Sequence, residues 1–230
     1  MNRTLIALRL QLVAWPTSIA LTWLIVGMSF TANVVVWGAI GDMPADAMTG
    51  GLTSAYIMFF LVYIAAMTQV FPFAVSFGIT RREFYGAMSL LAVAQAVTYG
   101  SLVAGMSVIE GATDGWGVGV KFFAPELIVT GNPVSQLAVY VVPFLFLAHV
   151  GMGLGIVYKR WGRNGVNALL TAVVAVAATA VVLISVLGGW DELGRWLQRQ
   201  SVVSLAVGWP LLVTAILAAA GYRAIRRATP

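Results

Sequence analysis

The sequence predicts an all-α, polytopic membrane protein with six transmembrane helices, one amphipathic helix before the first span and another before the sixth. Three observations lead to this class. The chain of 230 residues is 60% hydrophobic and only 9% charged, which is far less charge than the surface of a soluble domain carries. Its apolar stretches reach the length of about 20 residues that a helix needs to cross the hydrocarbon layer. Its basic residues lie in the short segments between these stretches. We therefore expect a single membrane domain over residues 1–230.

Residues 1–16 are expected to form an interfacial helix. Leucines and Trp15 recur at helical spacing on one face, and Arg3 and Arg9 lie on other faces, a pattern typical of a helix in the plane of the membrane surface. Pro16 predicts a bend before the first span. A secretory signal peptide is the competing interpretation of a basic start followed by apolar residues. No short apolar core with a cleavage site follows, so we expect the segment to stay in the mature protein.

Six apolar stretches predict the spans, and polar, glycine-rich or basic segments separate them. Pro72 predicts a kink near the end of the second span. The longest separating segment, 110–133, is rich in glycine, and its less polar part is expected to dip into the membrane or pack on its surface. Tryptophans and tyrosines lie near the predicted span ends, as interfacial anchors do. The expected spans are residues 17–40, 54–77, 87–109, 134–158, 166–187 and 202–222.

The segment before the last span, 188–201, predicts a second amphipathic helix. Trp190, Leu193 and Trp196 can share one face, while acidic and basic side chains lie on the other faces. Such a helix is expected to lie in the membrane interface.

Charge asymmetry predicts the orientation. Six spans place both termini on one side of the membrane, and ten of the 13 basic residues fall on that side. The positive-inside rule then places both termini in the cytoplasm of a multi-pass protein of the cell (plasma) membrane, with 188–201 outside. The net charge of +5 does not predict nucleic-acid binding, because the basic residues are spread over short segments beside the membrane. There they are expected to attract the anionic headgroups of the lipid bilayer.

A short charged turn, residues 78–86, separates the second and third spans. Gly78 can end a helix in the left-handed conformation, and Thr80 with Glu83 has the spacing of a capping box that starts a new helix. The turn is therefore expected to form a helical turn of its own, with Arg81 and Arg82 exposed. Two interpretations follow from this stretch alone: a docking site for a soluble partner, or an ordinary cytoplasmic loop with positive charges.

The motifs of energy conversion and catalysis are missing from the sequence. It contains no phosphate-binding loop of the kind that hydrolyses ATP and no cysteine. His149 is the one ionisable side chain, apart from tyrosines, expected in the middle of a span, and a lone histidine is typical of a packed residue hydrogen-bonded to a neighbouring helix. With no buried acid expected, neither a metal site nor a hydrolase constellation is predicted. We expect a chain that is not an enzyme, binds no cofactor and, if it transports, uses the energy of another subunit.

Two glycines in the fourth span predict close helix packing. Gly151 and Gly155 form a small-xxx-small pair, which lets two helices approach each other. Packing within the chain and dimerisation are both compatible with this pattern.

Taken together, these features resemble the membrane subunits of ABC exporters of the ABC-2 type, including short permeases that work with a separate ATPase chain. The architecture of nearly the whole chain is similar. The turn Phe77-Gly78-Ile79-Thr80-Arg81-Arg82-Glu83-Phe84-Tyr85 is similar to the Gly-x-(Ser/Thr)-Arg-(Arg/Lys) turn that follows the second span in that family and acts as its coupling helix. The glycine-rich end of the fourth span, followed by Lys-Arg-Trp-Gly, is similar as well. The sequence departs from the family in having no fused ATPase and no large extracellular domain.

The resemblance implies a dimer of permease subunits, either a homodimer or a heterodimer with a sister permease, seated on two ABC ATPase subunits that bind ATP and Mg. In the coupling turn, Arg81 and Arg82 are expected to contact acids of the ATPase, and Thr80 and Glu83 to hold the turn. Phe84 and Tyr85 are expected to form an apolar anchor. The family's substrate path runs between the second and fifth spans, which suits an apolar or amphipathic substrate such as a drug, lipid or hydrophobic peptide. The lining residues expected here are Met58, Phe59, Tyr63, Met67, Thr171, Ala175 and Thr179.

Two other functions remain compatible with the sequence. One is a non-transporting membrane subunit for assembly or immunity that uses the same turns to hold partners. The other is a proton-coupled secondary transporter centred on His149.

Overall fold

The described part of the chain is helical. The structure, a computed structural model, describes residues 3–41, 49–124 and 128–227, and side chains from residue 19 to residue 226 within those ranges. No strand occurs among these residues, so the all-α class is confirmed. Five helical runs among them are long and apolar enough to cross a membrane, which is compatible with a membrane protein. These runs are Ile19–Ile40, Leu52–Ser76, Arg81–Ala112, Pro133–Val186 and Ser204–Ala224.

The first helix, α1 (Arg3–Ile40), continues through Pro16 without an interruption. The separate helix that was expected to end at Pro16 is therefore not present as a distinct element. A proline inside a helix removes one backbone hydrogen bond and bends the axis, and an otherwise unbroken apolar helix tolerates that loss.

The second helical run has three parts. α2 (Leu52–Ala65) is followed by a π-helical turn at Ala66–Val70 and by α3 (Phe71–Ser76). Pro72 lies in the first turn of α3. Because proline has no N–H to donate to the carbonyl four residues earlier and its ring crowds that carbonyl, the helix widens just before it. The irregularity expected at Pro72 thus takes the form of a π-turn.

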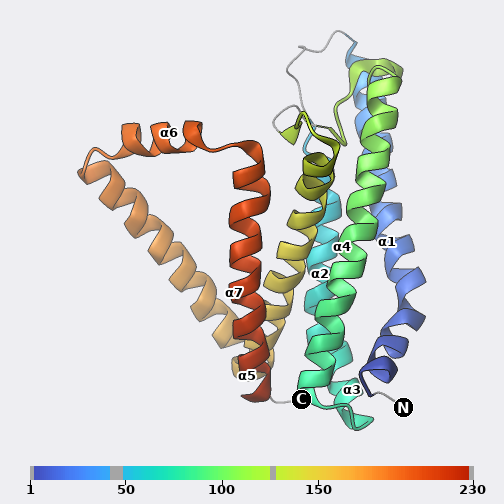
Figure 1. Ribbon diagram of the computed structural model, residues 1–230, viewed down its shortest axis with the longest axis vertical. Coiled ribbons are helices and arrows are strands. Elements are labelled where there is room, and N and C mark those ends of the chain that lie inside the picture. The colour runs from blue at the N-terminus through green and yellow to red at the C-terminus, as the bar shows by residue number, and fades with distance from the viewer. Residues whose placement is uncertain (1–2, 42–48, 125–127, 228–230) are drawn as a thin grey trace.

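The longest helix, α5 (Pro133–Val186), consists of two legs. Its 54 residues would extend about 81 Å as one straight helix, far more than the hydrocarbon layer. Gly162 interrupts it with φ 63° and ψ −158°, inside the basic segment between the expected fourth and fifth spans. We call residues 133–161 the first leg and residues 163–186 the second leg. In Figure 1 the two legs diverge from the break and run in opposite directions.

The hydrophobic core lies between α2, the first leg of α5 and α4 (Arg81–Ala112). Phe59, Tyr99 and Phe144 meet there edge to face. The hydroxyl of Tyr63 donates a hydrogen bond of 2.7 Å to Gln95 Oε1 and joins α2 to α4 inside the core. α1 packs against α2 and α4.

The second leg of α5 stands apart from this bundle. Every residue from 167 to 183 is exposed. From the tip of the second leg, α6 (Trp190–Arg199) crosses back towards the bundle, and α7 (Trp209–Ala224) returns beside the first leg (Figure 1). Both termini lie at the same end of the molecule (Figure 1).

Candidate functional site

The turn between α3 and α4 has the predicted caps. Gly78 adopts φ 80°, and the Gly78 and Ile79 amides donate to the carbonyls of Val75 and Ala74. The Thr80 hydroxyl accepts a hydrogen bond of 3.3 Å from the Glu83 amide, and Glu83 Oε2 accepts one of 2.9 Å from the Thr80 amide. The capping box is therefore confirmed.

The helix that begins at this cap is longer than predicted. It was expected to be a short turn ending near Gly86, but the same helix continues as α4 for 32 residues. A single glycine costs a helix only about 1 kcal/mol, and the buried face of α4 stabilises the helix on both sides of Gly86. The capped turn is thus the first turn of a membrane-length helix.

The aromatic pair of the turn faces the interior of the chain. Phe84 packs against Phe71 of α3, with ring centroids 5.4 Å apart. The ring of Tyr85 fills the space beside Gly221 of α7, where a β-carbon would collide with its hydroxyl. Both side chains are buried, so the apolar anchor joins the turn to its own bundle.

The two arginines of the turn differ in their surroundings. Arg82 is exposed, and its guanidinium lies 5.9 Å from the centre of the Tyr222 ring. Arg81 is half-buried and donates a hydrogen bond of 2.9 Å to the backbone carbonyl of Arg226. Next to this carbonyl, Ile225 is buried. The hydrogen bond of Arg81 therefore joins the first turn of α4 to the segment that follows α7.

Two exposed phenylalanines beside the turn were not among the residues expected to contact an ATPase. Phe73 and Phe77 are 55% and 66% exposed, and their ring centroids lie 4.6 Å apart. Their spacing of four residues at the very end of an apolar stretch is the signal that could have identified them, since such residues lie on one face of a helix. Phe73, Phe77 and Arg82 are exposed at the two helix ends that the turn joins, and we call these three residues the exposed face of the turn.

The residues expected to line a substrate path do not come together in the structure. On α2, Phe59 and Tyr63 are buried in the core and Met58 is half-buried, and Met67 in the π-turn after α2 is buried as well. On the second leg of α5, the expected residues are all exposed and stand apart from α2: Thr171, Ala175 and Thr179. The face of α2 chosen from the sequence is thus a packing face.

Residues of the second helical run and of both legs of α5 line one cavity. The cavity has a volume of about 480 Å³ and lies beside the π-turn. Three of its lining residues carry polar groups: Thr68, Gln69 and Tyr158. The others are apolar: Ile64, Leu154 and Val166. Such a mixed lining suits an amphipathic molecule.

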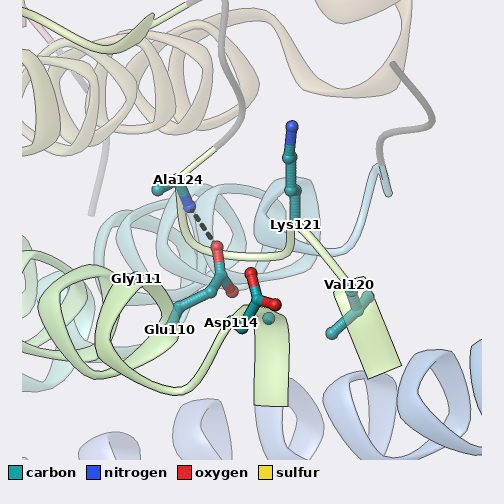
Figure 2. A pocket seen from close by; sticks show the side chains of 8 residues that line it. Glu110, Gly111, Asp114, Val120, Lys121 and Ala124 are labelled. Carbon is teal, nitrogen blue, oxygen red and sulfur yellow. Dashed lines mark hydrogen bonds between the residues drawn. The ribbon is translucent and has the colours of Figure 1, made fainter. Parts of the chain in front are cut away.

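Glu110, near the other end of α4, is a buried acid that the sequence did not predict. It is 3% exposed. Its Oε1 accepts hydrogen bonds from the amides of Phe123 and Ala124, at 3.2 and 2.9 Å. Its Oε2 accepts from Trp116 Nε1 at 3.1 Å and from the amides of Phe122 and Phe123 at 3.0 Å each. Figure 2 shows the carboxylate pointing towards Ala124, with the side chains of Asp114 and Lys121 nearby. The expectation of a chain without a buried acid is therefore wrong.

These hydrogen bonds hold an aromatic plug, which we define as residues 116–124. Phe122 and Phe123 are buried, and Phe30 of α1 contacts the rings of Trp116, Phe122 and Phe123. Phe122 lies over Gly51 at the start of α2 so closely that a β-carbon at Gly51 would overlap its ring. The plug thus packs into the end of the bundle opposite the capped turn.

His149 is buried in the first leg of α5. Its Nδ1 lies 2.9 Å from the carbonyl oxygen of Leu145, one turn earlier in the same helix. This hydrogen bond therefore stays within α5. The sequence had predicted a hydrogen bond to a neighbouring helix instead. Within the described ranges, no group of three or more histidine, cysteine or acidic side chains could hold a metal ion.

In comparisons with known proteins, no protein-family model, curated protein or solved structure matches the chain.

Proposed function

We propose that this chain is the membrane-spanning permease subunit of an ATP-driven exporter of the ABC-2 type. Two ABC ATPase subunits, which bind ATP and Mg, supply the energy. A second permease subunit completes the path, and the substrate is apolar or amphipathic, such as a drug, a lipid or a hydrophobic peptide. The chain lies in the cell membrane with both termini in the cytoplasm.

The construction of the capped turn carries this proposal. Its cap is the first turn of α4, and its aromatic pair is buried against α3 and α7. A displacement of the turn would therefore move a rigid helix of about 48 Å. Near the far end of that helix is Glu110, which holds the aromatic plug. One continuous element thus connects a surface at one end of the molecule with a packed plug at the other.

The exposed face of the turn has the chemistry of a docking surface. Phe73 and Phe77 present apolar rings, and Arg82 adds a positive charge. Aromatic and arginine side chains dominate the energy of protein interfaces. An ATPase groove with an apolar floor and an acidic rim would bind this face, and Arg82 is the arginine best placed for the acids.

The proposed permease crosses the membrane six times and has both termini in the cytoplasm. Each leg of α5 is longer than the about 20 residues that a crossing requires. Counting the legs separately makes six crossings, which agrees with two termini at one end (Figure 1). The basic side chains of the capped turn and of the break in α5 are at that same end, in line with the positive-inside rule.

The second leg of α5 is the surface we assign to the second permease subunit. It is exposed along residues 167–183, including the three residues expected to line the path. The amphipathic cavity beside the π-turn opens where this leg begins. Substrate would enter there and pass between the second legs of the two permeases.

Transport in reconstituted vesicles tests the proposal against a non-transporting assembly or immunity subunit. The complex purified from its native membrane would be placed in vesicles with a fluorescent amphipathic dye and a headgroup-labelled lipid as probes. We expect ATP, and not its non-hydrolysable analogue, to move at least one probe across the bilayer. A non-transporting subunit would hold its partners and move neither.

A further inference from the structure

A cleft lined by arginines lies between the break in α5 and the last turns of α7. Its volume is about 510 Å³, and its described lining consists of Arg160 from α5 and Ala220, Arg223, Ala224 and Arg226 from the end of the chain. No acid is among these lining residues. The C-terminal end of α7, which contributes to this lining, is at the end of the molecule where both termini lie (Figure 1).

The three arginines come from two separate parts of the chain: Arg160 from α5, and Arg223 and Arg226 from the end of α7 and the short 3-10 helix Ile225–Arg227 that follows it. Arginines in and just after the last turn of α7 interact favourably with that helix end, which accounts for Arg223 and Arg226 by themselves. It does not account for Arg160, whose guanidinium lies 4.3 Å above the ring of Trp161. The Arg226 guanidinium lies 5.9 Å from the centre of the Tyr222 ring. Like charges that line one cleft repel each other, and an anion bound between them offsets that repulsion. Guanidinium groups match phosphate oxygens with paired hydrogen bonds.

An apolar track leads from this cleft along α7. Leu212 and Ile216 are 52% and 59% exposed, and Ala220 is exposed in the next turn. The three residues repeat every fourth position, so they lie on one face of the helix, and this face ends at Ala224 in the cleft. The opposite face, with Thr214 and Gly221, is buried. A ligand with a phosphate in the cleft would thus find an apolar surface for a hydrocarbon chain directly beside it.

We propose that the arginine cleft binds the phosphate headgroup of an anionic phospholipid, with an acyl chain lying along the Leu212–Ile216 face. Basic pockets between membrane helices on the cytoplasmic side are suited to such headgroups. The lipid would connect the break in α5 to the end of α7 and so fix the angle at which the second leg leaves the bundle. This inference rests on the chain lying in a membrane and not on transport.

Lipid titration of the purified, delipidated chain in detergent tests this site. Native mass spectrometry would measure binding of dioleoyl phosphatidylglycerol and of dioleoyl phosphatidylcholine, which has the same acyl chains and a zwitterionic headgroup. We expect the anionic lipid to bind at least about tenfold more tightly, since each arginine contributes a charge-assisted hydrogen bond. Arg223→Gln should reduce that preference about tenfold. Arg160→Gln, on the other helix, should do the same and serves as the second variant if the first does not fold.

Matched controls separate the cleft from general positive charge and from a site for free phosphate. Arg163→Gln removes the same charge beside the cleft but outside its lining, and we expect less than a twofold effect. Equal loss in Arg163→Gln and Arg223→Gln would overturn the proposal, as would equal binding of the two lipids. Millimolar inorganic phosphate should not displace the bound phosphatidylglycerol. If it does, the cleft binds free phosphate and the lipid assignment is wrong.

Discussion

Glu110 stabilises the plug because its carboxylate accepts hydrogen bonds from several N–H groups of the plug. Three consecutive backbone amides and one indole N–H point at its carboxylate. Without an acceptor, buried amides of this kind each cost about 1–3 kcal/mol. The carboxylate has two oxygens that accept and no hydrogen to offer, so it satisfies all of them together.

We predict that Glu110→Gln destabilises the protein by about 2–4 kcal/mol. Glutamine has nearly the same shape, but one oxygen becomes an NH₂ group, and at least two N–H donors then face another donor. Thermal unfolding in detergent measures the effect. Asp114→Asn, an exposed neighbour in the same pocket, is the control and should be close to neutral. If the two variants unfold at the same temperature, the hydrogen bonds do not hold the plug.

Thr80 caps the N-terminus of α4. Thr80→Ala removes the acceptor for the Glu83 amide and should cost about 1 kcal/mol. Hydrogen exchange should accelerate at Glu83 and in the first turn of α4. Thr80→Ser keeps the hydroxyl and should exchange like the unaltered chain. Equal exchange in the alanine and serine variants would show that the cap does not order the turn.

These two residues differ in how far the sequence predicts them. The partners of Thr80 lie three residues away, so the spacing of the residues alone predicts the contact. The donors to Glu110 lie 6 to 14 residues further on, and they meet it only because the chain turns back at Asp114 and Trp116, both with positive φ. No local sequence pattern predicts a left-handed conformation for a tryptophan. The contacts of Glu110 with this glycine-rich loop were therefore not predictable from the sequence.

At the scale of elements, the close contact between α2 and the first leg of α5 depends on glycine. A β-carbon at Gly151 would lie 2.7 Å from the Phe60 carbonyl oxygen, and one at Gly155 would collide with the Met67 side chain. Gly153, between them, faces open space. The glycine pair thus serves packing within the chain.

We predict that Gly155→Ala costs about 1–3 kcal/mol, because the added methyl group overpacks the contact with Met67. Gly153→Ala should be neutral or slightly stabilising, since alanine favours helix. The midpoint of thermal unfolding in detergent distinguishes them. A neutral Gly155→Ala would mean that the two helices are not in the contact described.

The sequence predicts which segments form helices better than it predicts which side of each helix is buried. The apolar stretches around residues 54–77 and 134–158 became helices because both length and composition demand it. Phe59 and Tyr63, which were expected to line a path, are on the side of α2 that faces the core. An apolar helix that meets lipid on one side and protein on the other has hydrophobic residues all round, so its sequence does not indicate which side is buried. The break between the expected fourth and fifth spans was predictable, because a basic segment with two glycines separates them.

At the scale of the whole molecule, the exposed second leg of α5 predicts a permease partner. The chain has no cysteine, so a single introduced cysteine can carry a photo-crosslinking label at each position from 167 to 183. We expect crosslinks to a second permease, identical or sister, at positions three or four residues apart on one helix face. Buried Ala92→Cys on α4 should give none. The absence of a protein crosslink at every position of the leg would mean that lipid alone covers it.

ATP hydrolysis by the complex that purifies with this chain is the decisive measurement for coupling to an ATPase. We predict that an ATPase accompanies the unaltered chain from its native membrane. We also predict that Phe77→Asp with Arg82→Glu, which reverses the chemistry of the exposed face of the turn, removes most of that ATPase at equal levels of folded chain. The matched variant Trp196→Asp with Arg199→Glu, on α6 at the opposite end, should retain it. An ATPase that accompanies the turn variant undiminished, or no ATPase with the unaltered chain, would show that the turn does not couple this chain to an ATPase.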